Sequence, residues 1–291
     1  MFKHALVRSA TISVITLAAM AVPAISSATN SWGGYHWART TPQFTLKTVD
    51  NLTTSDWKGQ LSKTSSDWNS PTIFGAKSTP LLTAIVAGRN TQCTMVTGTT
   101  QVCNGSYGST GWLGLASINI TSGSHIVQGS AKMNDTYFAT SPYNTPNEKR
   151  HVMCQEVAHT FGLDHQSTDG SSQNTCMDYF SNTGSNAGSV LSTTPNTHDF
   201  DELNIIYAHL DSTTTAAAVT NSKAASSVSD VSNDPTTWGN LINHSPNGRS
   251  STYEKFNRDG SKTMTHIYWT AEAASRCPSC DHRYEDHRFD R

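Results

Sequence analysis

The chain has 291 residues, of which 14% are charged, and its formal net charge is −2. This near-neutral balance gives no electrostatic basis for binding nucleic acid or an anionic membrane surface, so neither is expected as a partner. The length allows one large domain or two smaller ones with a substantial core.

The N-terminus predicts a signal peptide. A basic start is followed by a mostly apolar run over residues 10–22 and by small residues at 26–28. The apolar run is too short to span a bilayer comfortably, and no other run approaches the ~18 residues required. We therefore expect residues 1–28 to be removed, and the mature protein to be secreted without membrane association.

Six cysteines in an oxidising compartment favour disulfides over free thiols. Their spacing suggests three local pairs, although fifteen connectivities are formally possible. The predicted pairs are Cys93–Cys103, Cys154–Cys176 and Cys277–Cys280. Because two histidines follow the last pair in "CPSCDHRYEDH", a small zinc site remains an alternative to a disulfide there.

The first half of the chain predicts strands interrupted by one helix. Residues 53–69 have the spacing of an amphipathic helix capped by Thr54 or Ser55. The continuous apolar run over 80–88 indicates a buried strand. Residues 93–103 predict a hairpin closed by its own cysteines. Further strands are expected over 44–49, 111–120 and 124–134.

The next helix begins with a clear signal in "TPNE". Thr145 stands at the cap, Pro146 at the first helical position and Glu148 three residues after the cap, which is the pattern of a capping box. The helix is expected to run to about Phe161 and to end at Gly162, because glycine favours the backbone conformation that terminates helices.

The remaining sequence predicts one more helix, followed by a change in amino-acid composition. Residues 198–210 form the last predicted helix, with Asp199 and Glu202 as a second capping box. A stretch rich in Ser, Thr and Ala, without aromatic residues, then indicates a flexible linker. We therefore expect a metallopeptidase-like catalytic domain over residues 29–211 and a linker over 212–235. Residues 236–291 form a C-terminal segment without a predicted role.

The stretch "QEVAHTFGLDH" carries the predicted chemistry. Residues four apart in a helix lie on one face, so Gln155 and His159 can point at a single ion. Gly162 lets the chain leave the helix sharply, so that His165 can return as a third ligand. Glu156 is positioned to take a proton from a metal-activated water. The pattern therefore predicts a catalytic zinc site with three protein ligands.

This stretch resembles the metzincin signature H-E-x-x-H-x-x-G-x-x-H at every defined position except the first. Downstream, "CMDY" is similar to the methionine turn of that family, with Met177 in the turn and Tyr179 two residues later. The resemblance implies that Tyr179 can bind the metal or the developing oxyanion. It also implies that residues 111–116 form the edge strand that pairs with extended substrate. The expected fold is α/β: a metzincin-like zincin with a twisted, mixed and mostly parallel sheet packed against the active-site helix, plus a short C-terminal extension.

Gln155 stands where the family has a histidine, and three interpretations follow. Its carbonyl oxygen binds Zn²⁺ together with His159 and His165, which the helix register favours. Alternatively His151, one turn earlier, replaces it, although it lies out of phase with His159. In the third interpretation the metal has been lost.

We therefore expect a secreted zinc-dependent endopeptidase that acts on protein or peptide substrates, with Glu156 as general base. The alternative from a different class is a catalytically inactive secreted binding module on a metzincin scaffold. The sequence does not predict peptide specificity or oligomeric state.

Overall fold

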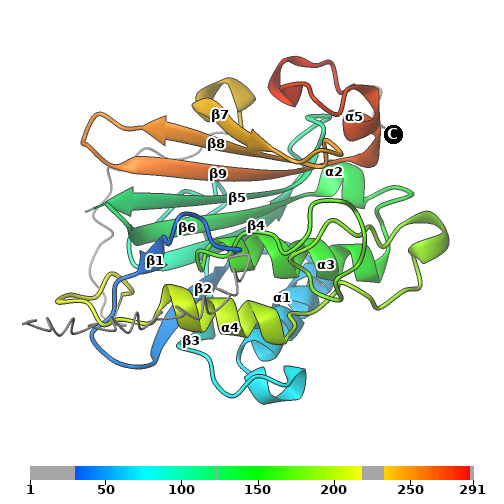
Figure 1. The fold of residues 1–291 in the computed structure, drawn as a ribbon. Coiled ribbons are helices and arrows are strands. Elements are labelled where there is room, and N and C mark those ends of the chain that lie inside the picture. Colours follow the sequence, from blue (N-terminus) through cyan, green and yellow to red (C-terminus); the bar gives the residue numbers. More distant parts are fainter. Residues whose placement is uncertain (1–29, 122, 218–232, 289–291) are drawn as a thin grey trace, which may run out of the picture.

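The computed structural model describes residues 30–121, 123–217 and 233–288 (Figure 1). The predicted signal peptide lies outside the described residues, as does most of the predicted linker, residues 218–232. Among the described residues, no helix has the length and apolar character needed to cross a membrane.

One sheet organises the described chain. Its strands follow the order β3-β2-β4-β6-β5-β9-β8-β7, and β1 pairs with β6 beside this path. The strands are β1 (His36–Trp37), β2 (Phe44–Asp50), β3 (Leu81–Ala87), β4 (Thr99–Gly105), β5 (Trp112–Thr121), β6 (His125–Asn134), β7 (Asn240–His244), β8 (Ser250–Phe256) and β9 (Lys262–Trp269).

The direction of pairing changes at β5. β2 pairs in parallel with β3 and β4, and β4 pairs in parallel with β6. In contrast, β5 runs antiparallel to both β6 and β9, and β8 runs antiparallel to β9 and β7. The predicted α/β class with a mixed sheet packed against helices is therefore confirmed, but the antiparallel part is larger than the mostly parallel sheet we expected.

The longer helices α1 (Ser55–Trp68), α3 (Pro146–His159) and α4 (Thr197–Ile206) lie on the same side of the sheet (Figure 1). They bury a shared apolar core in which Trp57, Trp68 and Phe161 are almost fully inaccessible. Burial of such large aromatic side chains is the main favourable term holding the helices to the sheet. Two shorter helices are α2 (Asp135–Phe138) and α5 (Ala271–Arg276).

The predicted helix starts are confirmed at two places and displaced at a third. Thr54 caps α1, and Thr145 caps α3 with Pro146 at its first position. The Glu148 carboxylate does not complete a capping box, because it accepts hydrogen bonds from the Asn182 N–H and the Ser181 hydroxyl instead. The capping box of α4 is formed by Asn196 and Asp199, so the predicted pairing of Asp199 with Glu202 is wrong by one turn.

Two strand predictions need correction. The run over 80–88 does form β3, but β3 is the outermost strand of the sheet and Ile85 is 41% exposed. The predicted hairpin over 93–103 contributes a single strand, β4, although its cysteines do form a disulfide. Apolar content alone did not distinguish an edge strand from a central one.

The C-terminal segment belongs to the same sheet. β9 pairs with β5 along eight residue positions, and β8 and β7 extend the sheet beyond it. On the face of the sheet away from α3, Trp238, Tyr253 and Trp269 build a second core with Trp112 and Leu115 of β5. Residues 236–291 therefore complete the architecture instead of forming a short extension.

Candidate metal centre

Helix α3 and the turn after it present the first two histidines. His159 is the last residue of α3, and the chain then reverses at Gly162, whose φ is +100°. A side chain at Gly162 would also meet the Tyr35 carbonyl oxygen, because a Cβ there would lie 2.0 Å from it. Only glycine satisfies both conditions, and the turn brings His165 back beside His159, with ring centroids 4.6 Å apart.

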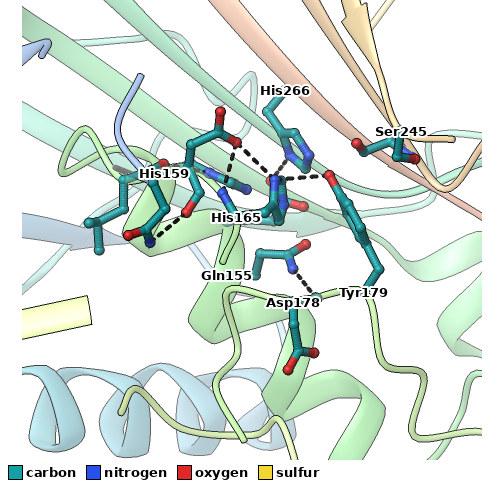
Figure 2. Close-up of polar contacts among 12 residues, drawn as sticks. Gln155, His159, His165, Asp178, Tyr179, Ser245 and His266 are labelled. Atoms are coloured by element: carbon teal, nitrogen blue, oxygen red, sulfur yellow. Dashed lines mark hydrogen bonds and ion pairs between the residues drawn. The ribbon is translucent and has the colours of Figure 1, made fainter. Parts of the chain in front are cut away.

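A third histidine, His266, comes from β9. Its ring centroid lies 4.0 Å from that of His159 and 4.7 Å from that of His165. One ligand atom of each of the three residues lies within 4.8 Å of those of the others. Figure 2 shows the three imidazoles converging from the helix, the following loop and the C-terminal strand. The sequence analysis missed His266.

Hydrogen bonds fix the same tautomer in all three rings. His159 Nδ1 donates to the Leu163 carbonyl at 2.8 Å, and His165 Nδ1 lies 2.9 Å from the Asp164 carboxylate. His266 Nδ1 faces the Glu156 carboxylate at 3.4 Å. Each Nε2 is therefore left with a lone pair, and these three buried Nε2 atoms have no hydrogen-bond partner among the described residues. Such an arrangement fits a metal ion, whose histidine ligands commonly donate their other ring N–H to a carboxylate or carbonyl.

Burial sets the protonation of the cluster. Desolvation, followed by the neighbouring His165, lowers the pKa of His159 to about 3. Burial lowers the pKa of His266 well below its usual value, with smaller contributions from the two other histidines. Burial also raises the pKa of the Glu156 carboxyl well above its usual value. His159 and His266 are thus neutral and available as ligands near neutral pH.

Gln155 is held by the turn that follows the loop carrying His165. Its Nε2 donates to the Cys176 and Asp178 carbonyls at 2.9 and 2.8 Å, while its buried Oε1 has no hydrogen-bond partner among the described residues. Figure 2 shows the side chain with its amide nitrogen toward Asp178. The predicted role of Gln155 as a ligand stays a prediction, but three histidines gather without it.

His151, the alternative ligand, does not join the histidine cluster. Its Nε2 donates to the Asp178 carbonyl at 3.1 Å. The out-of-phase helical position therefore directs this ring to the turn backbone, as its spacing from His159 suggested.

The predicted methionine turn lies against the helix. Met177 is fully buried, and its carbonyl accepts a hydrogen bond from the backbone N–H of Gln166, next to His165. The predicted Cys154–Cys176 disulfide joins α3 to this turn, and the Cys93–Cys103 and Cys277–Cys280 pairs are also bonded. The alternative of a zinc site built on the last two cysteines is therefore not supported.

Tyr179 stands at the rim of the centre. Its hydroxyl lies 2.9 Å from His165 Nδ1, on the side of that ring away from Nε2 (Figure 2). Burial raises the pKa of the Tyr179 hydroxyl well above its usual value, so the group is a neutral phenol whose oxygen accepts from His165 Nδ1–H. In this position the tyrosine orients His165 together with Asp164.

Glu156 and His159 are each packed against a second element. The Glu156 carboxylate lies over Gly114 of β5, where an added Cβ would approach its Oε1 to 2.3 Å. The indole of Trp32 stacks on the His159 ring with centroids 5.0 Å apart and planes 8° from parallel. The N-terminal segment is held there by backbone hydrogen bonds from Trp32 to Gly162 and from Asp164 to Asn30.

The predicted substrate-pairing edge is covered. Residues 112 and 114–120 of β5 pair with β9, so an extended peptide cannot add to this edge in the present arrangement. Two cavities of about 260 and 210 Å³ open on either side of Asp164. The larger one is bordered by His165, Tyr179 and Ser245, beside the β7–β8 turn, whereas Glu156, His159 and His266 are fully buried.

No protein-family model matches this chain, and no curated protein matches its sequence. The assignment of the centre therefore rests on the geometry of the residues themselves.

Proposed function

We propose that this protein is a secreted zinc-dependent hydrolase of peptide bonds, with His159, His165 and His266 as the protein ligands of the ion. The observation that carries the proposal is a cluster of three histidines next to the carboxylate of Glu156. Each offers a ring nitrogen within 4.8 Å of those of the others, and each has a buried Nε2 without a hydrogen-bond partner among the described residues. Three imidazole donors suit Zn²⁺, and three protein ligands leave a coordination position for chemistry.

Zn²⁺, when bound, supplies a Lewis acid that acidifies water and polarises a carbonyl group. Glu156 handles the protons: it accepts one from the attacking water and later delivers it to the leaving amine. Two features suit this carboxylate to the task. Its Oε1 has no hydrogen-bond partner among the described residues, and Gly114 leaves room for it beside β5.

Gln155 and Tyr179 act as positioning residues in this proposal. The Gln155 amide ties α3 to the turn carbonyls of Cys176 and Asp178. Tyr179 and Asp164 both contact His165 Nδ1 and keep its Nε2 directed inward. The family-derived role of Tyr179 at the oxyanion would require its hydroxyl to turn away from His165 when substrate binds.

The covered edge of β5 limits the proposed substrate. The cavity beside His165, of about 260 Å³, is smaller than the clefts of about 300–1,000 Å³ that commonly hold ligands, which favours a small substrate. We therefore expect short peptides or exposed chain ends to be cleaved more readily than the interior of folded proteins.

The disulfides support the proposed secretion. Three disulfides join all six cysteines, which fits an oxidising compartment outside the cytoplasm.

A binding module on the same scaffold is the second candidate, and one observation favours it. Glu156 is fully buried, and β9 occupies the edge that an extended substrate would use. Such a module would hold zinc and bind peptides without cleaving them.

A cleavage assay with a mixture of short peptides separates the two. The zinc-loaded chain should cleave the mixture, lose the activity with a chelator and regain it with added Zn²⁺, as followed by mass spectrometry. His198→Ala, which changes an exposed histidine on α4, is the matched control. Stoichiometric zinc without any cleavage would favour the binding module, whereas cleavage that resists the chelator would exclude a metal-dependent mechanism.

A further inference from the structure

A second group of histidines gathers at the opposite end of the described N-terminal segment. His36 belongs to β1, His125 begins β6, and His209 and Asp211 follow the end of α4. The Asp211 Oδ1 lies 3.5 Å from His36 Nε2, 3.1 Å from His125 Nε2 and 3.4 Å from His209 Nε2. Three chain segments that are far apart in sequence therefore direct four potential ligand atoms toward one point.

Four of the six separations among these ligand atoms are close to those of a four-coordinate ion. With bonds of about 2.0–2.1 Å to a tetrahedral Zn²⁺, neighbouring ligand atoms lie roughly 3.3–3.4 Å apart. The three distances to Asp211 bracket this value, and His36 Nε2 lies 3.2 Å from His209 Nε2. The ligand atoms of His36, His125 and Asp211 are all within 4.8 Å of one another.

The hydrogen bonds around the cluster leave acceptor atoms facing one another. His36 Nδ1 lies 2.9 Å from the Gly34 carbonyl and donates to it, so the neutral ring presents a lone pair at Nε2. The other oxygen of Asp211, Oδ2, accepts the backbone N–H of Arg39 at 2.9 Å, which fixes the carboxylate. A cation between the His36 lone pair and the carboxylate oxygen would be attracted to both.

The surroundings favour a metal ion over extra protons as that cation. Protonating several of these rings would crowd positive charges around one carboxylate. A divalent ion satisfies all the lone pairs at once. The side chains of His36 and Asp211 are only 5% and 7% exposed, so the position is shielded from solvent on one side. His125 and His209 are more exposed and leave an entry path.

We propose that His36, His125, His209 and Asp211 form a second Zn²⁺ site whose role is structural. Four protein ligands close the coordination sphere, which is typical of structural zinc and leaves no position for substrate. The ion would join β1, the start of β6 and the chain after α4. This site does not depend on the proposed function, because it shares no residue with the centre at His159.

The site would also hold the segment that covers the first centre. Residues between Trp32 and His36 connect the two, with Trp32 stacked on His159 and His36 in the second cluster. Trp37 extends the connection, since its indole N–H donates to the Thr160 carbonyl at the end of α3.

The test is a zinc count on the full chain after removal of metal with a chelator and dialysis against Zn²⁺. We expect two equivalents in the wild-type chain, one in His125→Gln and in Asp211→Asn, and two in the His198→Ala control. His266→Ala should also retain one equivalent of zinc. The double variant with His266→Ala and His125→Gln should retain none. Circular dichroism checks that each variant is folded. Asp211 also accepts a backbone hydrogen bond, so the more exposed His125 provides the variant least expected to unfold.

Cobalt substitution gives an independent reading of the same site. Co²⁺ bound in four-coordinate geometry has strong visible absorption, and His125→Gln should remove part of that spectrum while His198→Ala leaves it unchanged. Two zinc equivalents retained in folded His125→Gln and Asp211→Asn would overturn the proposal, as would a wild-type chain whose single equivalent is lost in His266→Ala.

Discussion

His266 of β9 stands opposite Ala116 of β5 in the antiparallel ladder, and this pairing brings its imidazole to 4.0 Å, centroid to centroid, from that of His159. The same strand therefore covers the edge predicted to bind substrate and also contributes a histidine to the candidate metal centre. A chain shortened before β9 would lose both. The division that we expected after residue 211 does not separate two sheets, because β9 of the C-terminal segment pairs with β5.

Replacing the proposed base should separate proton transfer from metal binding. Glu156→Gln should lower the rate of peptide cleavage by about 10²–10⁴-fold, because the amide cannot accept a proton from water. The zinc content should remain unchanged, since the carboxylate is not among the proposed ligands. Glu202→Gln, at another buried carboxylate, is the control and should retain activity. Wild-type turnover in Glu156→Gln would refute the proposed role.

The disulfide between the helix and the turn should contribute measurably to stability. Cys154 and Cys176 are 22 positions apart, and closing a loop of this length reduces the entropy of the unfolded chain by an amount worth about 3 kcal/mol. Replacing both by alanine should lower the free energy of unfolding in urea by roughly this amount. The matched pair Cys277 and Cys280 closes a loop of only 3 positions and should cost less. Equal losses for the two pairs would contradict the loop-closure account.

Cleavage in the predicted linker should not separate the N-terminal fragment, which carries β5, from the C-terminal fragment, which carries β9. A protease should cut first within the linker predicted over residues 212–235, because its Ser, Thr and Ala composition is typical of a flexible segment. The fragments should nevertheless elute together in gel filtration, because β9 remains paired with β5, and should separate only in denaturant. A chain ending at Asp211 should be poorly soluble, since it exposes β5. Fragments that separate without denaturant would show that the C-terminal strands are not integral to the sheet.

The stability should depend on pH through Asp199. Burial raises the pKa of this carboxyl to about 6, although Thr175, Asn196 and Gln166 donate hydrogen bonds that oppose the shift. The folded chain thus holds the proton more tightly than the unfolded chain. This contribution to stability is complete below about pH 4 and is lost as the pH rises through about 6, with a total on the order of 2–3 kcal/mol.

Urea unfolding at pH 4, 5, 6 and 7 tests this dependence. Asp199→Asn should have a lower stability overall, because it weakens the cap of α4, but a flatter profile between pH 4 and 7 than the parent chain. Parallel profiles for the two chains would assign the dependence to other groups.

Local signals in the sequence predicted much of the fold. Thr145 and Pro146 marked the start of α3, and Gly162 marked the turn after it, because capping and positive φ are properties of a few neighbouring residues. The three disulfides followed from spacing in the same way. Both Asn196 and Asp199 are residues that can cap a helix, and the prediction chose Asp199, whereas the structure has Asn196 at the cap of α4.

No local sequence signal identified His266, the third histidine of the candidate metal centre. His266 lies 107 positions after His159 in a strand with no metal-binding spacing of its own, and only the pairing of β9 with β5 brings the two together. The same is true of His36, His125 and Asp211. Local sequence spacing can predict metal ligands that lie on one helix and the turn after it. Ligands on different strands come together only through the strand order of the sheet, which local spacing does not predict.

A crystal structure of the zinc-loaded chain, with anomalous diffraction recorded at the zinc edge, tests the central claim most directly. We predict an anomalous peak about 2.0–2.1 Å from the Nε2 atoms of His159, His165 and His266, with Gln155 still hydrogen-bonded to the carbonyls of Cys176 and Asp178. A peak bonded to the Gln155 Oε1 with His266 turned away, or no peak between the histidines, would contradict the account.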